Sequence, residues 1–148
     1  MTITRMDAVA EARSWLGTPF KHQGCLKGVA CDCIGLAKGV GLALGLSTYD
    51  PDTPEAKAYA NYPLLPDSKR MREALGTWLV SIPVPEATLA DILFLAWGRE
   101  PQHVALITGK GIIHSYSGVG EVVEHSLDER WQRRVTAAYR YPYFAENS

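Results

Sequence analysis

The sequence predicts an α+β fold in which N-terminal helices pack on a C-terminal antiparallel sheet of about five strands. Helical patterns of apolar residues all fall within residues 4–80, whereas five short apolar runs, typical of strands, follow residue 91. Most of these runs are joined by short turns, and short connections pair strands antiparallel. Helices and strands that are segregated along a chain are typical of the α+β class.

Length and composition are those of one ordinary domain. The 148 residues are expected to form a single domain over residues 1–148, with 47% hydrophobic and 21% charged residues. A net charge of −1 argues against a nucleic-acid partner, and the absence of a run of about 18 apolar residues argues against a membrane span. The N-terminus has no apolar run of signal-peptide length, so we expect synthesis in the cytoplasm and export only by another carrier.

The first helix is expected over residues 4–16. Thr4 can cap its N-terminus, and Gly17 followed by Pro19 ends it. A loop rich in glycine and cysteine follows over residues 18–32. The apolar residues expected to face the core mostly share one side: Met6, Val9, Ala10, Ala12 and Leu16.

A second helix is expected over residues 33–45. It is apolar nearly all round, which predicts burial. Its glycines at positions 35, 39 and 41 weaken it intrinsically but allow another segment to pack very close. Residues 46–66, with four prolines and three tyrosines, are interpreted as a long surface loop with a short helix from Pro54. A loop of that length is often functional.

The remaining elements are one more helix and the strands. The helix is expected over residues 67–80, capped by Asp67 or Ser68, and strands are expected at five places. The inward residues of the helix are Met71, Leu75, Trp78 and Leu79, and the strands cover 92–96, 104–108, 112–116, 121–124 and 136–141. Glycine-rich turns lie at residues 109–111 and 117–120.

The three cysteines, Cys25, Cys31 and Cys33, lie close together in the sequence. An odd, clustered set is a poor disulfide framework, and it lacks the two close pairs that structural zinc usually needs. We therefore expect no metal and no cofactor, while a Cys25–Cys31 disulfide in an oxidising setting stays open.

Cys33 is the candidate nucleophile because it stands where the loop meets the buried helix. Unpaired N–H groups and the positive end of the helix dipole favour a thiolate there, and the same groups can hold an oxyanion. A nucleophilic cysteine also needs a base, and the histidines are His22, His103, His114 and His125.

His103 and His114 can be related through the turn between their strands. A two-residue turn, at 109–110 or 110–111, points both side chains to the same face of the sheet, whereas a three-residue turn separates them. Taken alone, His103 is equally well a surface histidine at a strand end, and His114 a hydrogen-bonded core histidine.

Several stretches of the sequence, taken in order, resemble the motifs of a known protein family. The stretches that carry it are ARSWLGTPF at 12–20, His22 with Gln23, DCIG at 32–35, ADILF at 90–94, HVALITG at 103–109 and IIHSYS at 112–117. In this order they resemble the NlpC family of papain-like cell-wall peptidases. Residues 121–142, with WQRR at 131–134 and YRYP at 139–142, resemble the end of its phage-type branch.

The resemblance implies a papain-like fold and a triad of Cys33, His103 and His114. Cys33 attacks an amide carbonyl, His103 takes the thiol proton, and His114 orients His103. The backbone N–H of Cys33 is the implied oxyanion donor. Asp32 is implied to bind a free amine of the substrate.

Phe20 departs from the family pattern. The family often has a tyrosine there, whose hydroxyl contributes to the oxyanion site. Either His22, Gln23 or another substrate-binding group therefore takes the place of that hydroxyl, or the oxyanion site is weaker.

The implied activity is hydrolysis of stem-peptide amide bonds in bacterial peptidoglycan, commonly between D-glutamate and the diamino acid. The phage-type branch implies a wall hydrolase carried by a phage tail or gene-transfer particle, which acts in the periplasm or cell wall with particle proteins as partners. Two alternatives stay open: a non-catalytic structural tail component, and an amidase or acyltransferase that acts on another substrate.

Overall fold

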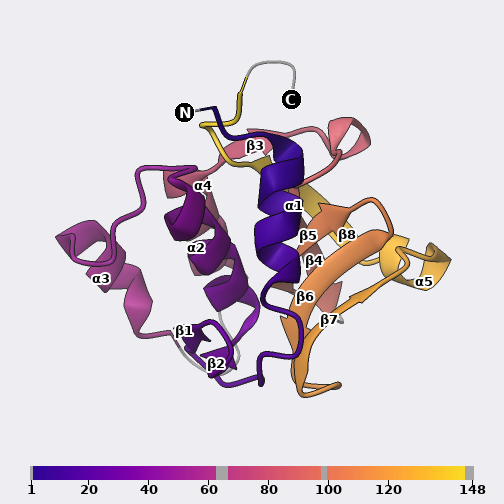
Figure 1. Cartoon of the computed structure of the whole chain (residues 1–148), viewed down its shortest axis with the longest axis horizontal. Coiled ribbons are helices and arrows are strands. Elements are labelled where there is room, and N and C mark those ends of the chain that lie inside the picture. The colour runs from indigo at the N-terminus through magenta and orange to yellow at the C-terminus, as the bar shows by residue number, and fades with distance from the viewer. Residues whose placement is uncertain (1, 63–66, 98–99, 146–148) are drawn as a thin grey trace.

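Helices and sheet form separate layers in the computed structural model, which describes residues 2–62, 67–97 and 100–145 (Figure 1). Helices α1 (Arg5–Arg13), α2 (Cys33–Leu44) and α4 (Ser68–Trp78) lie together on one side, and α3 (Pro54–Ala60) lies outside them. The predicted α+β class is confirmed, with helices followed by strands along the chain.

The sheet is antiparallel and has six strands within the described residues, rather than about five. Its spatial order is β3-β8-β4-β5-β6-β7, so β4 to β7 form the expected meander and β8 returns to pair with β4. The additional strand is β3, which pairs with β8 at the edge. The strands are β3 (Val80–Ile82), β4 (Ile92–Trp97), β5 (Glu100–Thr108), β6 (Gly111–Tyr116), β7 (Glu121–His125) and β8 (Val135–Arg140).

Apolar side chains cover both faces of the sheet. Along β4, Phe94 packs with the helices, whereas Leu93 and Leu95 belong to a smaller cluster on the other face. This alternation is the period of two that a strand imposes. Trp131, on the short helix α5 (Glu129–Gln132), covers the smaller cluster. The sequence interpretation did not include α5.

Helix α1 is shorter than predicted. Thr4 caps it as expected, with Asp7 completing a capping box, but the helix ends at Arg13 and the chain turns before Gly17. Leu16 lies beyond the end of the helix and is exposed. Met6 and Ala10 lie on the helix but are exposed as well, so the prediction that these three residues face the core was wrong. The residues that α1 buries are Ala8, Val9 and Ala12.

Helix α2 is placed as predicted, and its glycines allow the predicted close packing. Asp32 caps its N-terminus, and Gly45 ends it in the left-handed conformation, at φ +62°. A Cβ on Gly39 would stand 2.1 Å from Trp15, and a Cβ on Gly35 would stand 1.9 Å from the carbonyl oxygen of Gly24. Only glycine fits at these two positions, so α2 seats directly against the preceding loop.

The segments before and after α2 hold more structure than loops. Strands β1 (Cys25–Leu26) and β2 (Ala30–Cys31) form a small hairpin inside the predicted loop 18–32. The predicted short helix from Pro54 is α3, while residues 63–66 of the same loop lie outside the described part. Helix α4 is capped by Asp67, and Met71 is buried as expected. A one-turn 3-10 helix, Val84–Glu86, follows β3.

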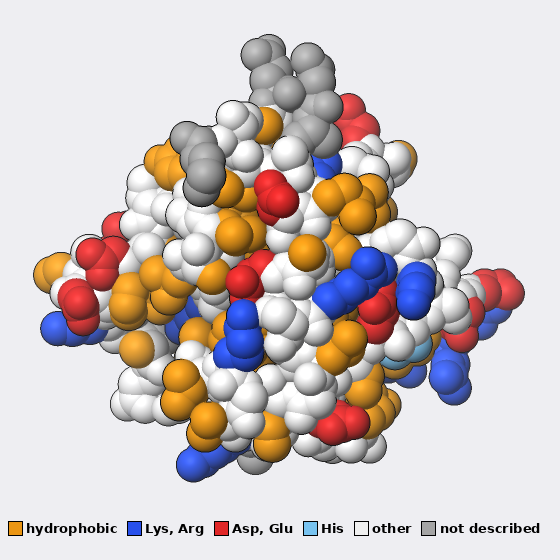
Figure 2. All heavy atoms as spheres, viewed as in Figure 1, with side chains coloured by type: hydrophobic (Ala, Val, Ile, Leu, Met, Phe, Trp, Pro, Cys, Tyr) orange, Lys and Arg blue, Asp and Glu red, His pale blue; other side chains and the backbone are white. Residues whose placement is uncertain are grey.

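The surface carries charges of both signs. Figure 2 shows Lys and Arg side chains interspersed with Asp and Glu on the face in view, without one sign dominating. No helix in the described ranges has the length and apolar character needed to cross a bilayer.

Candidate active site

Cys33 is the first residue of α2, and its position depends on Asp32. One carboxylate oxygen of Asp32 accepts a hydrogen bond from the N–H of Gly35 at 2.7 Å, which caps the helix. The other accepts from the N–H of Gln23 at 2.8 Å, which joins the helix start to the preceding loop. Cys33 is half-buried, and its thiol faces the backbone of Val104 on β5.

The thiol is protonated at rest. Burial, together with the negative charge of Asp32, raises the pKa of Cys33 to about 12. The backbone N–H groups of Val104, Ile34 and Cys33 itself lower the pKa, as expected for a helix start, but they do not outweigh burial. The helix start predicted a thiolate before substrate binds, whereas the raised pKa indicates a thiol that must lose its proton during the reaction.

His103 and His114 are in direct contact. Gly109 and Lys110 form a two-residue turn, so Thr108 pairs with Gly111 and both histidines point to the same face. Nε2 of His103 lies 2.5 Å from Nδ1 of His114, which confirms the predicted proximity. The backbone N–H of Val104, the residue after His103 on β5, faces the thiol of Cys33.

Both histidines are neutral at physiological pH. Burial lowers the pKa of His114 to about 3, with a further contribution from His125. Burial and the neighbouring His114 lower the pKa of His103 well below its ordinary value. A neutral imidazole can accept a proton, so the pair suits a general base. His125, on β7, continues the contact: its Nε2 lies 2.8 Å from Nε2 of His114.

The three residues predicted to bind substrate all contact Tyr62. The hydroxyl of Tyr62 donates to the carboxylate of Asp32. Its carbonyl oxygen lies 3.0 Å from Nε2 of His22 and accepts from Nε2 of Gln23 at 2.7 Å. The structure thus brings Asp32, His22 and Gln23 together, around a residue that the sequence interpretation placed only in a functional loop.

The remaining cysteines are free thiols. Cys25 and Cys31 stand opposite each other in the β1–β2 hairpin, but their sulfur atoms point to different carbonyl groups, those of Gly35 and Asp32. Burial raises the pKa of both thiols. Phe20 is half-buried beside Cys31 and carries no hydroxyl to donate.

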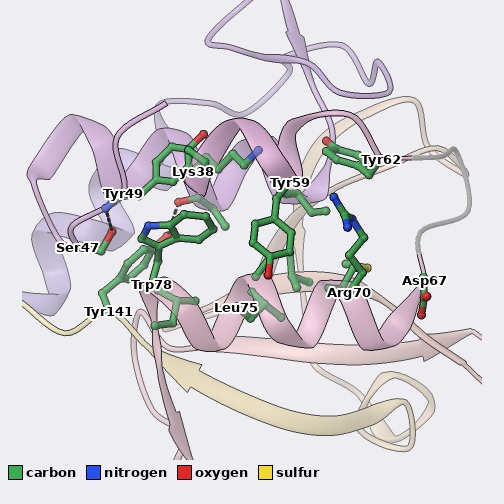
Figure 3. A pocket seen from close by; sticks show the side chains of 18 residues that line it. Lys38, Ser47, Tyr49, Tyr59, Tyr62, Asp67, Arg70, Leu75, Trp78 and Tyr141 are labelled. Carbon is green, nitrogen blue, oxygen red and sulfur yellow. Dashed lines mark hydrogen bonds between the residues drawn. The ribbon is translucent and has the colours of Figure 1, made fainter. Parts of the chain in front are cut away.

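A pocket lined by α2 and α4 begins at Ile34, the residue after the candidate nucleophile. It has about 890 Å³, including solvent at its mouth, and Ile34 and Val104 at its wall flank the positions of Cys33 and His103. Figure 3 shows Lys38 reaching into it from α2 and Arg70 from α4, with Tyr59 between them. The other labelled lining residues are Ser47, Tyr49, Tyr62, Asp67, Leu75, Trp78 and Tyr141.

The two cations rest on aromatic rings. Nζ of Lys38 lies 5.6 Å from the ring centre of Tyr49 and 5.7 Å from that of Tyr62, and Arg70 lies 5.0 Å from that of Tyr59. Neither cation forms an ion pair with a carboxylate in the described part of the chain. The pocket is therefore mainly apolar and aromatic, with two cations, Lys38 and Arg70, and one carboxylate, that of Asp67, on its wall.

Solved NlpC/p60 domains are similar in structure to this chain. The NlpC/p60 domain of the peptidoglycan hydrolase SagA matches with a TM-score of 0.61 and 22% identity, covering 93% of this chain and 98% of that one. An NlpC/p60 family protein from Bacillus cereus matches at 0.66 and 21%, covering 96% and 41%. The P60 domain of an M. avium subspecies paratuberculosis antigen matches at 0.58 and 18%, covering 95% and 96%.

These likenesses define the fold of the chain, which is the NlpC/p60 fold, as the sequence resemblance predicted. No protein-family model matches the sequence, and a search of curated proteins finds no similar sequence. The candidate site is therefore defined by the geometry around Cys33, His103 and His114.

Proposed function

We propose that this protein is a cysteine peptidase that hydrolyses stem-peptide amide bonds of bacterial peptidoglycan. The observation that carries the proposal is a thiol at the start of a buried helix, beside a strand whose histidine contacts a second histidine. This arrangement occurs within the fold of peptidoglycan hydrolases. A thiol with an adjacent, oriented base is the arrangement that acyl transfer requires.

The reaction begins with proton transfer, because the thiol is neutral at rest. The sulfur of Cys33 attacks the amide carbonyl while His103 takes the thiol proton, and His103 then gives that proton to the leaving amine. The resulting thioester is hydrolysed by water that His103 activates. The backbone N–H of Cys33, in the first turn of α2, is the proposed donor to the oxyanion.

The pocket beside the thiol is proposed to receive the acyl part of the substrate. Stem peptides carry free carboxylates, and Lys38 and Arg70 are cations that form no salt bridge with a carboxylate among the described residues. The bond proposed is that between D-glutamate and the diamino acid. The place of action is proposed to be the cell wall, reached as part of a phage tail or phage-like particle.

Digestion of defined muropeptides tests the proposal. The wild type is expected to release stem-peptide fragments, and Cys33→Ala to release none while its circular dichroism spectrum stays unchanged. Cys25→Ala, which removes an exposed thiol outside the site, is the matched control and is expected to cleave normally.

The products separate this function from its alternatives. Equal activity of wild type and Cys33→Ala would exclude the cysteine mechanism. Intact muropeptides after prolonged incubation with the wild-type protein would favour one of the two alternatives: a non-catalytic structural tail component, or an amidase or acyltransferase that acts on another substrate.

A further inference from the structure

His103, His114 and His125 form a row of three contacting histidine rings, the histidine row. Nδ1 of His125 lies 2.9 Å from the backbone carbonyl oxygen of Ser126. A carbonyl oxygen can only accept a hydrogen bond, so Nδ1 of His125 must carry the hydrogen. In the neutral ring, Nε2 of His125 is then an unprotonated acceptor.

This terminal bond determines the proton positions of the whole row. Nε2 of His114, 2.8 Å from Nε2 of His125, must donate to it. Nδ1 of the neutral His114 is then an acceptor, and it lies 2.5 Å from Nε2 of His103, which therefore donates. The remaining ring nitrogen of His103, Nδ1, is left as the basic nitrogen.

The alternative tautomer of His114 would disable the base. If Nδ1 of His114 carried the hydrogen, Nε2 of His103 would have to accept it. The neutral His103 would then be protonated at Nδ1 and could not take a proton from a thiol. The proton on His114 therefore decides whether His103 works.

Aromatic rings hold the row in this arrangement. The ring of Tyr116 stacks on that of His114, with 5.2 Å between centres and 3° between planes. Trp131 contacts both His114 and His125, with ring centres 5.1 Å and 4.9 Å away. The rings cannot rotate freely, because each is packed against an indole or a phenol.

We propose that His125 is a positioning residue that, through its bond to the Ser126 carbonyl, sets the tautomers of His114 and His103 and so presents an unprotonated Nδ1 as the base for Cys33. His125 itself does not touch the substrate or the thiol. The catalytic part of this inference rests on the proposed function, whereas the tautomers are a property of the resting protein.

Nitrogen-15 NMR of histidine-labelled protein at pH 7 tests the tautomers without any substrate. We expect hydrogen on Nδ1 of His125, on Nε2 of His114 and on Nε2 of His103. In His125→Phe the acceptor for His114 is lost, and we expect a mixture of tautomers at His114. Ser126→Ala keeps the backbone carbonyl and should leave the wild-type pattern.

Kinetics give the second measurement. His125→Phe should lower kcat for muropeptide cleavage by roughly 10²-fold with little change in KM, the scale of a lost general base. His125→Gln, whose amide oxygen can accept from His114, should recover most of the activity. Ser126→Ala should match the wild type.

The outcomes distinguish this inference from the proposed function. Hydrogen on Nδ1 of His114 in the wild type, or an unchanged tautomer pattern in His125→Phe, would overturn the role of His125 whatever the enzyme cleaves. A wild type that has the predicted tautomers but leaves muropeptides intact would contradict the proposed function and support the tautomer assignment.

Discussion

Two buried polar clusters in this protein are built in opposite ways. The carboxylate of Asp91, fully buried before β4, accepts hydrogen bonds from Arg5 at 2.9 Å and from Arg140 at 2.9 and 3.0 Å. The N–H of Thr88 adds a fourth at 2.9 Å. The histidine row is also largely buried, but its members are joined by single bonds between rings.

The type of bond in each cluster indicates its role: the charged bonds to Asp91 hold elements of the fold together, whereas the bonds between neutral histidine rings suit proton transfer. Every bond to Asp91 joins a charged acceptor to a donor, and together they tie α1 and β8 to the turn before β4. A proton on Asp91 would weaken all of them. The histidines avoid charge, because burial lowers the pKa of His103 and of His114, and a neutral row can gain and lose a proton.

The largest expected effect comes from breaking the ionic cluster. Asp91→Asn should lower the free energy of unfolding by about 3–5 kcal/mol, because it leaves two arginines without their buried counter-charge. Activity per folded molecule should stay near that of the wild type. Urea denaturation measures the loss, and Glu129→Gln, which removes a surface ion pair with Arg133, is the control with little expected change. A stable Asp91→Asn protein without activity would show that the two clusters are not separate.

Acid should destabilise the folded protein through the histidine row. The unfolded state binds protons at an ordinary histidine pKa of about 6.5, whereas folded His114 titrates at about 3. The unfolded state therefore holds more protons in this window, so stability present above pH 6.5 is lost as pH falls toward 3. Protonation of His114 alone should lower the free energy of unfolding by about 2 kcal/mol between pH 6.5 and pH 5, at roughly 1.4 kcal/mol per pH unit.

Thermal unfolding between pH 7 and pH 5 measures this effect. His114→Leu should show a shallower fall in Tm than the wild type over that range. Equal slopes in the two proteins would mean that His114 is not a buried neutral group.

A smaller effect is expected from a change that touches neither cluster. In Gly39→Ala the new methyl group would stand 2.1 Å from Trp15, so α2 and Trp15 must separate, at a cost of about 1 kcal/mol or more. Gly76→Ala in α4 is the matched control, because open space surrounds that position and alanine favours a helix. Chemical denaturation of both variants measures the difference. A destabilised Gly76→Ala with a normal Gly39→Ala would contradict the packing described for α2.

Features decided within one turn of the chain could be predicted from the sequence. Thr4 and Asp67 cap helices through their own side chains, as expected. A two-residue turn was one of the two possibilities at residues 109–111, and with it His103 and His114 share a face of the sheet. The segregation of helical and strand patterns along the chain predicted the order of helices and sheet, and the family resemblance added the NlpC fold. These parts of the fold were predicted correctly.

Features that depend on distant partners could not be predicted. Strand β3, three residues long, is a strand only because it pairs with β8, far along the chain. Tyr62 reaches Asp32 from 30 residues away, and no local pattern singles it out within its loop. The pKa of Cys33 was expected to fall because of the helix start, but burial and the negative charge of Asp32 raise it.

In the proposed reaction Cys33 forms the covalent intermediate. The direct measurement is mass spectrometry of the protein after a rapid acid quench during muropeptide turnover. The account predicts an added mass equal to the acyl fragment, located on the peptide that contains Cys33 and missing from Cys33→Ala. Turnover of muropeptide with an adduct on another residue, or with Cys33→Ala fully active, would contradict it.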